Sequence, residues 1–237
     1  IRSSPVQIGT SSWITVSAGD SHSAAIRSDG ALFTWGPNNN GRLGDGTTTN
    51  RSSPVQIGTS SWTAVAVNKS PATAIGFTAA IRKDGALFTW GSNGSGQLGD
   101  GTTTDRSSPV QIGTSSWTAV APGDTHTAAI RKDGALFTWG SNGSGQLGLD
   151  LSGSNPNVIS TSSWTAIATG DSHSVAIRSD GALFTWGYNG TGQLGDGTIT
   201  NRSSPVQIGT SSWTTVTAGK SHTAAIRSDG LLFTCGL

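Results

Sequence analysis

Four histidines recur at equivalent places in the chain, and most of them follow an aspartate by two residues. His22 follows Asp20, and the other three are His126, His173 and His222. Imidazole and carboxylate groups are metal ligands, and a carboxylate behind a histidine can orient it. However, equivalent atoms of similar units lie on a wide circle, and Phe77 stands at the fifth equivalent position. We therefore interpret the histidines as structural and expect no metal ion.

No set of residues in the sequence indicates catalysis. With one cysteine and no glutamate, the chain cannot form an internal disulfide or a metal site built on paired thiolates. The Asp-Gly-Thr loops at Asp45, Asp100 and Asp196 lack the carboxylate spacing of calcium loops, so we interpret them as solvated turns. The GSNGSGQLG segments lack the lysine and the helix of a phosphate loop. We expect a protein that is not an enzyme and holds no cofactor.

The composition limits the class of partner. The 237 residues carry a formal net charge of +1, and charged residues make up 11% of the chain. No apolar run reaches the roughly 20 residues of a membrane span. Without a cationic field to attract phosphates or anionic lipid, the chain is expected to bind neither nucleic acid nor membrane.

Internal repetition organises the whole chain into five units of roughly 50 residues, a period typical of solenoids and propellers. Apolar residues show no helical periodicity in any segment. Two series of tryptophans mark the units, and we expect them to form the core. The first series is Trp13, Trp62, Trp117, Trp164 and Trp213, and the second is Trp35, Trp90, Trp139 and Trp186, with Cys235 in the last place.

Each unit contains four short β-like runs, typically SSPVQIG, SWTAVA, HTAAIR and ALFTWG. An Asp-Gly pair such as Asp133-Gly134 joins the last two runs, which predicts a β-hairpin. Both faces of these runs carry small or apolar residues, as blades stacked around an axis require. We predict an all-β fold, a β-propeller of about five four-stranded blades, as a single domain over residues 1–237.

These residues resemble the repeat of the regulator of chromosome condensation family, G-x-x-H-[ST]-x-A-[LI]-x-x-D-G-x-[LV]-[FY]-x-W-G-x-N-x-x-G-Q-L-G. The third unit matches this pattern from Gly123 through His126 and Trp139 to Gly148. The resemblance, to a polar version like those of bacteria and phages, implies either a closed ring or an arc of a larger one. Asn93, Asn142 and Asn189 fall on the pattern, so we interpret them as turn residues rather than glycan acceptors. Because the chain opens with SSPVQIG and ends after an ALFTWG-type run, we expect its ends to meet in one blade or at one seam.

Differences between the units predict where a partner binds, because near-identical units supply only a scaffold. The second unit has an insertion within residues 67–77, and the segment 149–160 departs from its counterparts. Apolar residues within polar loops tend to mark contact sites. Alternatively, the insertion caps its own blade and Phe77 fills the place of a histidine. The candidate partner-binding residues are Asn68, Lys69, Pro71, Ile75, Phe77, Leu149, Leu151 and Tyr188.

We expect a non-enzymatic propeller that acts as a protein- or glycan-binding or structural module on an extracellular or virion surface. Its partners would be a protein, a glycan or neighbouring subunits of a larger assembly. A propeller-type protein inhibitor or lectin is the alternative. A guanine-nucleotide exchange factor, as in the founding family member, is less favoured because the chain carries no basic tail.

Overall fold

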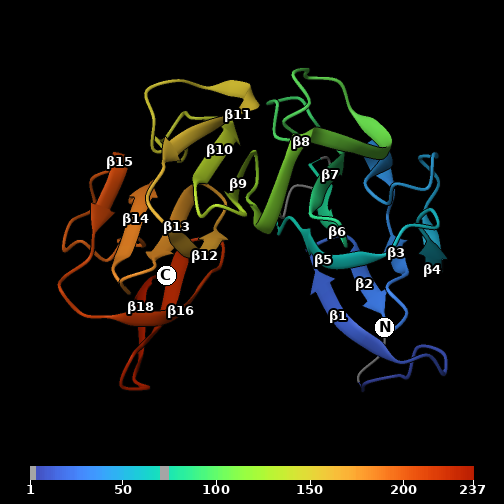
Figure 1. The fold of residues 1–237 in the computed structure, drawn as a ribbon, viewed down its shortest axis with the longest axis horizontal. Helices are drawn as coiled ribbons and strands as arrows, with labels where there is room; N and C mark the ends of the chain where they lie inside the picture. The colour runs from blue at the N-terminus through green and yellow to red at the C-terminus, as the bar shows by residue number, and fades with distance from the viewer. Residues whose placement is uncertain (1–3, 70–74) are drawn as a thin grey trace.

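A computed structural model describes residues 4–69 and 75–237, which form strands joined by short loops (Figure 1). The only helix among them is a 3-10 turn, η1 (Asn39–Gly41). The strands are β1 (Trp13–Ala18), β2 (Ser23–Arg27), β3 (Leu32–Gly36), β4 (Arg51–Gln56), β5 (Trp62–Val67), β6 (Phe77–Arg82), β7 (Ala86–Gly91), β8 (Arg106–Pro122), β9 (His126–Arg131), β10 (Leu136–Gly140), β11 (Gly153–Ser160), β12 (Trp164–Thr169), β13 (His173–Arg178), β14 (Leu183–Gly187), β15 (Arg202–Gln207), β16 (Trp213–Ala218), β17 (His222–Arg227) and β18 (Leu232–Gly236).

The strands form five antiparallel blades that follow one another along the chain. Strands β1–β4 form blade 1, β12–β15 form blade 4, and β16–β18 form blade 5. The seven-stranded sheet β5–β11 is two blades, because the 17-residue strand β8 pairs first with β7 and then, from Trp117 onward, with β9. The first strands of all five blades line one central cavity of about 240 Å³. This is the propeller arrangement that the repeats predict.

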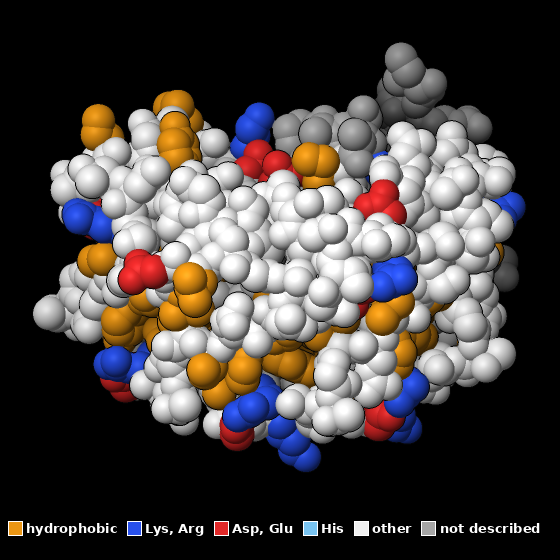
Figure 2. All heavy atoms as spheres, turned by 90° about the horizontal axis from the view of Figure 1, so that it is seen from above, with side chains coloured by type: hydrophobic (Ala, Val, Ile, Leu, Met, Phe, Trp, Pro, Cys, Tyr) orange, Lys and Arg blue, Asp and Glu red, His pale blue; other side chains and the backbone are white. Residues whose placement is uncertain are grey.

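A hairpin with an Asp-Gly turn lies at the centre of every blade, as the sequence predicts. In blade 1, β2 pairs with β3, and Gly30 at the turn has a φ of 89°, which glycine adopts without strain. Asp29 accepts the backbone N–H of Ala31 and pairs with Arg27, whose guanidinium lies 4.9 Å from the ring centre of Phe33. Similar Arg–Asp pairs occur in the other blades. On the face in Figure 2, Lys and Arg side chains gather along the lower edge with Asp beside them, and most of the remaining surface is uncharged.

The hydrophobic core is divided into layers, one between each pair of neighbouring blades. Between blades 1 and 2, Ile26, Leu32 and Ile57 pack against Trp62 and Trp90. Equivalent clusters fill the other three seams. Trp90, Trp139 and Trp186 are fully buried there. The tryptophans of the second series therefore pack between neighbouring blades. The sequence predicts that they belong to the core.

The outer strand of each complete blade comes from the following sequence unit. In blade 1 this strand is β4, where Gln56 pairs with Phe33 and Val55 pairs with Thr34 of β3. The repeat alignment places the SSPVQIG run at the start of its own unit, and the observed register corrects that assignment. The shift has a structural effect, because Ile57 at the end of β4 enters the seam and ties each blade to the next.

The two ends of the chain do not meet, so our prediction of a shared blade or seam is wrong. The N and C ends lie on opposite sides of the arc in Figure 1. Residues 4–10 lie outside any strand, and within 4–69 and 75–237 no strand pairs with the outer edge of β18. The end faces are consequently open to solvent: Leu232 is 67% exposed, whereas the equivalent Leu32 is fully buried. The described residues form an open arc of five blades.

Candidate functional site

Three of the four histidines lie in the seams between blades. His22 Nε2 is 2.8 Å from Thr78 Oγ1 of the next blade, and His126 Nε2 is 3.0 Å from Ser174 Oγ. His173 and Thr223 form the third pair, at 3.0 Å. Each hydroxyl also donates to a backbone carbonyl of the preceding blade, at Arg42, Gln146 and Gln193 respectively. Since a hydroxyl has one hydrogen to give, it must accept from the histidine, and Nε2 therefore carries a proton in each pair.

Burial keeps these imidazoles uncharged. It lowers the pKa of His22 and of His126 to about 3, and that of His173 to about 4. An imidazole that carries its proton on Nε2 and bonds a hydroxyl there has no free Nε2 lone pair for a metal. The aspartates two residues upstream form no hydrogen bond to the histidines in the described residues. The arrangement fits the structural interpretation, in which the histidines hold neighbouring blades together.

Two residues at the histidine position of the repeat, His222 and Phe77, depart from this arrangement. His222 is exposed, because no further blade follows blade 5 in the described arc. Phe77 is fully buried at the place that histidine occupies in the other blades. In the second tryptophan series, Trp35 is only half-buried because it faces the open end of blade 1. Position in the arc therefore changes the environment of otherwise equivalent residues.

The Asp-Gly-Thr loops are exposed turns, as we interpreted them, but their aspartate carboxylates are buried rather than solvated. The side chain of Asp100 is 3% exposed and pairs with Arg106 at 2.7 Å. Its other oxygen accepts from Thr102 and from Asn93 Nδ2. Asp45 and Asp196 make the same contacts in blades 1 and 4. Each loop is a polar cluster that is closed by its own arginine, so the carboxylate needs no cation from solution.

We expect Asn93→Ala to destabilise the protein by about 1–3 kcal/mol, the usual cost of leaving buried polar groups without partners. Asn93 is fully buried, accepts from Leu98 N at 3.0 Å, and donates to Thr102 O at 3.1 Å. Asn142, the equivalent in blade 3, is half-buried and lies in a loop without the Asp–Arg pair. Asn142→Ala should therefore cost less when both variants are unfolded in urea. Equal losses of unfolding free energy in the two variants would show that the Asp–Arg cluster adds no stability.

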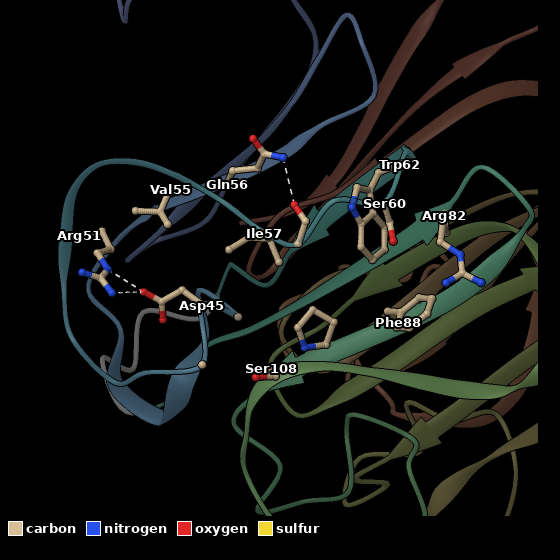
Figure 3. Close-up of a pocket in the computed structure, with 14 residues that line it drawn as sticks. Asp45, Arg51, Val55, Gln56, Ile57, Ser60, Trp62, Arg82, Phe88 and Ser108 are labelled. Carbon is tan, nitrogen blue, oxygen red and sulfur yellow. Dashed lines mark hydrogen bonds and ion pairs between the residues drawn. The ribbon is translucent and has the colours of Figure 1, made fainter.

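A groove of about 470 Å³ lies on the outside of the seam between blades 1 and 2 (Figure 3). Asp45, Arg51 and Val55 lie on one side, and Phe88 and Arg82 lie on the other. Its polar groups bond one another: Arg51 pairs with Asp45 at 2.6 Å, and Gln56 Nε2 donates to Gly58 O at 3.0 Å. Arg82 is paired with Asp84. The charged side chains that line the groove are therefore paired with one another or with a neighbouring residue.

The insertion in blade 2 is anchored inside the fold at both of its described ends. Asn68 is buried and bonds the backbone of Ile75 and Phe77. Neither Asn68 nor Phe77 can be reached by a partner, which fits the alternative in which the insertion caps its blade. Lys69 is exposed, and its Nζ lies 3.4 Å from Ala218 O of blade 5 at the central cavity. Ile75 is half-buried, and the candidate Pro71 lies outside the described residues.

The remaining candidates lie on blades 3 and 4, where exposed apolar residues depart from the repeat. Leu151 is 73% exposed, Tyr188 is also exposed, and Leu149 is half-buried. Sequence reasoning missed Ile199, which is 73% exposed where the sister units have threonine. It also missed Val158, which pairs with Phe137 at the register position that Gln111 holds opposite Phe88 in blade 2. The sequence signal was available, since Ile199 is a single departure from a repeated threonine and Val158 lies within the irregular segment 149–160.

A comparison with protein families decides the relationship that the repeats suggest. Residues 2–237 match the family model described as RCC1-like domain. The chain belongs to this family. Ultraviolet-B receptor UVR8 of Arabidopsis thaliana is 34% identical to this RCC1-like chain over 114 residues, which are 47% of the chain and 25% of the receptor. The match confirms the resemblance that the repeat pattern gives.

Solved structures show the same fold for this RCC1-like chain. The structure of human WBSCR16 superposes with a TM-score of 0.81 at 24% identity, over 94% of this chain and 60% of that chain. Yeast RCC1 (Prp20), solved bound to Kap60, gives a TM-score of 0.80 at 21% identity, over 94% and 56% of the two chains. The chain therefore spans less than two thirds of the length of these proteins. The described residues themselves form an open arc of five blades rather than a closed ring.

Metal clusters and membrane-spanning helices are both absent from residues 4–69 and 75–237. Among these residues, no group of three or more His, Cys, Asp or Glu side chains is placed to hold a metal ion. No helix in this part of the chain is long and apolar enough to cross a membrane.

Proposed function

We propose that this RCC1-like arc is a non-enzymatic protein-binding module that binds its partner through the loops of blades 3 and 4. The single observation that carries the proposal is a group of four exposed apolar side chains that depart from the repeat on two neighbouring blades, whereas blade 1 has an isolated departure of this kind, Ile14. Leu151, Val158, Tyr188 and Ile199 all lie on these two neighbouring blades. Exposed apolar groups that gather on one part of a surface tend to mark contact sites.

The internal contacts of the repeats take up the polar groups of the regular loops, so a partner has to contact the side chains that depart from the repeat. In blades 1, 2 and 4, each Asp-Gly-Thr loop bonds its own arginine, threonine and asparagine. Blade 3 lacks this cluster, because Leu149 replaces the aspartate and Gly153 replaces the arginine in the pairing with Gly140. In this loop Leu151 is 73% exposed, whereas Leu149 is half-buried.

The relatives support a protein rather than a glycan as the partner. Yeast RCC1 (Prp20) is described as bound to Kap60, and a second structure of it is described with binding to Gsp1p and histones. These partners are proteins. For this chain we propose the same class of partner, and we propose an extracellular or virion surface as its setting because so little of the chain is charged.

The proposal is tested with a variant that restores the repeat on blades 3 and 4. Residues 149–158 are replaced by DGTTTDRSSPVQ, the blade 2 sequence, and Tyr188→Ser and Ile199→Thr are added. The variant should fold, because sister units already carry these residues. Peptides selected from a display library on the native chain should bind the variant about tenfold or more weakly, the effect of losing roughly 1.4 kcal/mol or more.

The matched control changes the other irregular segment and leaves blades 3 and 4 intact. Replacing residues 67–77 by PGDTH, the blade 3 sequence, should preserve peptide binding. If the selected peptides bind both variants as well as the native chain, or if only a glycan array gives binding, the proposed surface is wrong. A structural-subunit role would instead appear as self-assembly that survives the blade 3 and 4 change.

A further inference from the structure

The seam between blades 4 and 5 contains a mainly apolar cavity of about 240 Å³. Among the residues that line it, Leu183, Leu194 and Ile208 come from blade 4, and Trp213 and Ala225 come from blade 5. Cavities of roughly 150 Å³ that are lined by leucine, isoleucine and phenylalanine stay dry and bind benzene. The cavity between blades 4 and 5 therefore has room for a larger aromatic molecule.

The other three seams hold a tryptophan ring at the equivalent place. The rings are fully buried and belong to Trp90, Trp139 and Trp186. A Cβ added to Gly99 would lie 2.6 Å from Trp139 Nε1, so the indole lies directly against this glycine. At the equivalent Gly195, the atom nearest to such a Cβ is Cys235 Sγ, at 3.0 Å. Because a thiol fills much less space than an indole, the residue type at position 235 leaves room between the two blades.

A backbone carbonyl that contacts the lining residue Cys235 is the acceptor that a tryptophan ring uses in other seams. Between blades 2 and 3, Gln97 O accepts from Trp139 Nε1 at 2.9 Å, and the same bond occurs between blades 3 and 4. The equivalent acceptor between blades 4 and 5 is Gln193 O, to which Cys235 Sγ donates at 3.3 Å. A thiol is a weak donor, so an N–H group in the cavity can replace it at this carbonyl.

The charged groups around the cavity favour an uncharged ligand. Arg227 is the one charged side chain among the described residues that line it, and Asp229 pairs with this arginine at 2.6 Å. Burial raises the pKa of the Cys235 thiol, so the thiol keeps its proton at neutral pH. A charged group on a bound ring would enter the seam without a partner, which opposes binding.

We propose that the cavity between blades 4 and 5 binds a flat, uncharged bicyclic aromatic molecule with one N–H donor, the class to which indole belongs. The ring occupies the place that Trp139 and Trp186 occupy in the other seams, and its N–H donates to Gln193 O. The exposed residues of blades 3 and 4 on which the proposed function rests do not line this cavity. The two proposals therefore concern different parts of the arc and are tested separately.

Isothermal titration calorimetry with indole tests the site on the native chain and on two variants of position 235. The native chain should bind one molecule of indole, and so should the control Cys235→Ala, which leaves the cavity open. Cys235→Trp restores the residue of the sister units and fills the cavity, so it should bind indole about tenfold or more weakly with unchanged circular dichroism. Absence of binding to the native chain, or equal binding to Cys235→Trp, overturns the proposal.

A comparison of ligands on the native chain tests the chemistry of the site without any substitution. Indene has the shape of indole but no N–H group, so it should bind about fivefold more weakly, the effect of losing one neutral hydrogen bond. Indole-3-acetate carries a carboxylate and should bind more weakly still. If either molecule binds as tightly as indole, the proposed ligand class is wrong.

Discussion

Replacing Trp139 by alanine should lower the free energy of unfolding by about 3–5 kcal/mol, the largest effect expected of any single substitution in the arc. The indole is fully buried in the seam between blades 2 and 3, where it lies 6.1 Å from the ring of Trp117. Its Nε1 donates to Gln97 O of the preceding blade at 2.9 Å. Alanine would leave a cavity in this layer, and Gln97 O would keep only the hydrogen bond from Thr127 Oγ1.

Two comparison variants separate the cavity from the hydrogen bonds. Trp35→Ala removes the same side chain at the open end of blade 1, where it is half-buried, and should cost clearly less. His126→Ala removes the bond to Ser174 and should cost about 1–3 kcal/mol. Urea denaturation of the three variants gives the order. A loss for Trp35→Ala as large as that for Trp139→Ala would mean that blade 1 is covered in solution.

The repeats allowed the fold to be predicted almost completely, but not where one blade ends and the next begins. The hairpins at the Asp-Gly pairs and the buried tryptophans follow from local patterns, and the structure has them. Alignment of equal units gives a period but no starting point. Only the pairing of Gln56 with Phe33 shows that the SSPVQIG run completes the preceding blade. Closure was unpredictable for a related reason, since it depends on the angle that packed side chains set between blades.

The polar contacts were harder to predict. Some of the partners are far apart in the sequence, and others are side chains of the same loop that hydrogen-bond one another. Thr78, the partner of His22, is 56 residues away in the sequence. Asp45 and Arg51 are only six residues apart, and the same spacing in three units was a signal that the sequence offered. The buried Arg42, which donates to Ser21 Oγ at 2.6 Å, gave no such signal, since the other units have glutamine there. Exposed departures such as Ile199 become meaningful only when their neighbours in space are known.

The stability of the arc should fall steeply as the pH is lowered from 7 to 5, by about 4–5 kcal/mol. His22, His126 and His173 have folded pKa values of about 3, 3 and 4 because they are buried. In the unfolded chain each takes up a proton near the ordinary histidine pKa of 6.5. Below that pH the unfolded state binds three protons that the folded state does not bind. Each of these histidines therefore lowers the free energy of unfolding by about 1.4 kcal/mol per pH unit.

Asp171 acts in the opposite direction and limits the fall. Burial and the nearby Asp124 raise the pKa of Asp171 to about 6, so the folded state takes up a proton as the pH drops below that value. This gain stabilises the fold between about pH 6 and pH 4. Asp171 is partly open to solvent, so screening holds its contribution to about 1 kcal/mol or less. The three histidines therefore determine the sign of the pH dependence.

The histidine origin of this pH dependence can be isolated with His126→Gln. Glutamine keeps an N–H donor for Ser174 Oγ but does not titrate, so the difference in unfolding free energy between pH 7 and pH 5 should shrink by about 2 kcal/mol. If His126→Gln leaves that difference at the native value, the buried histidines do not determine the pH dependence.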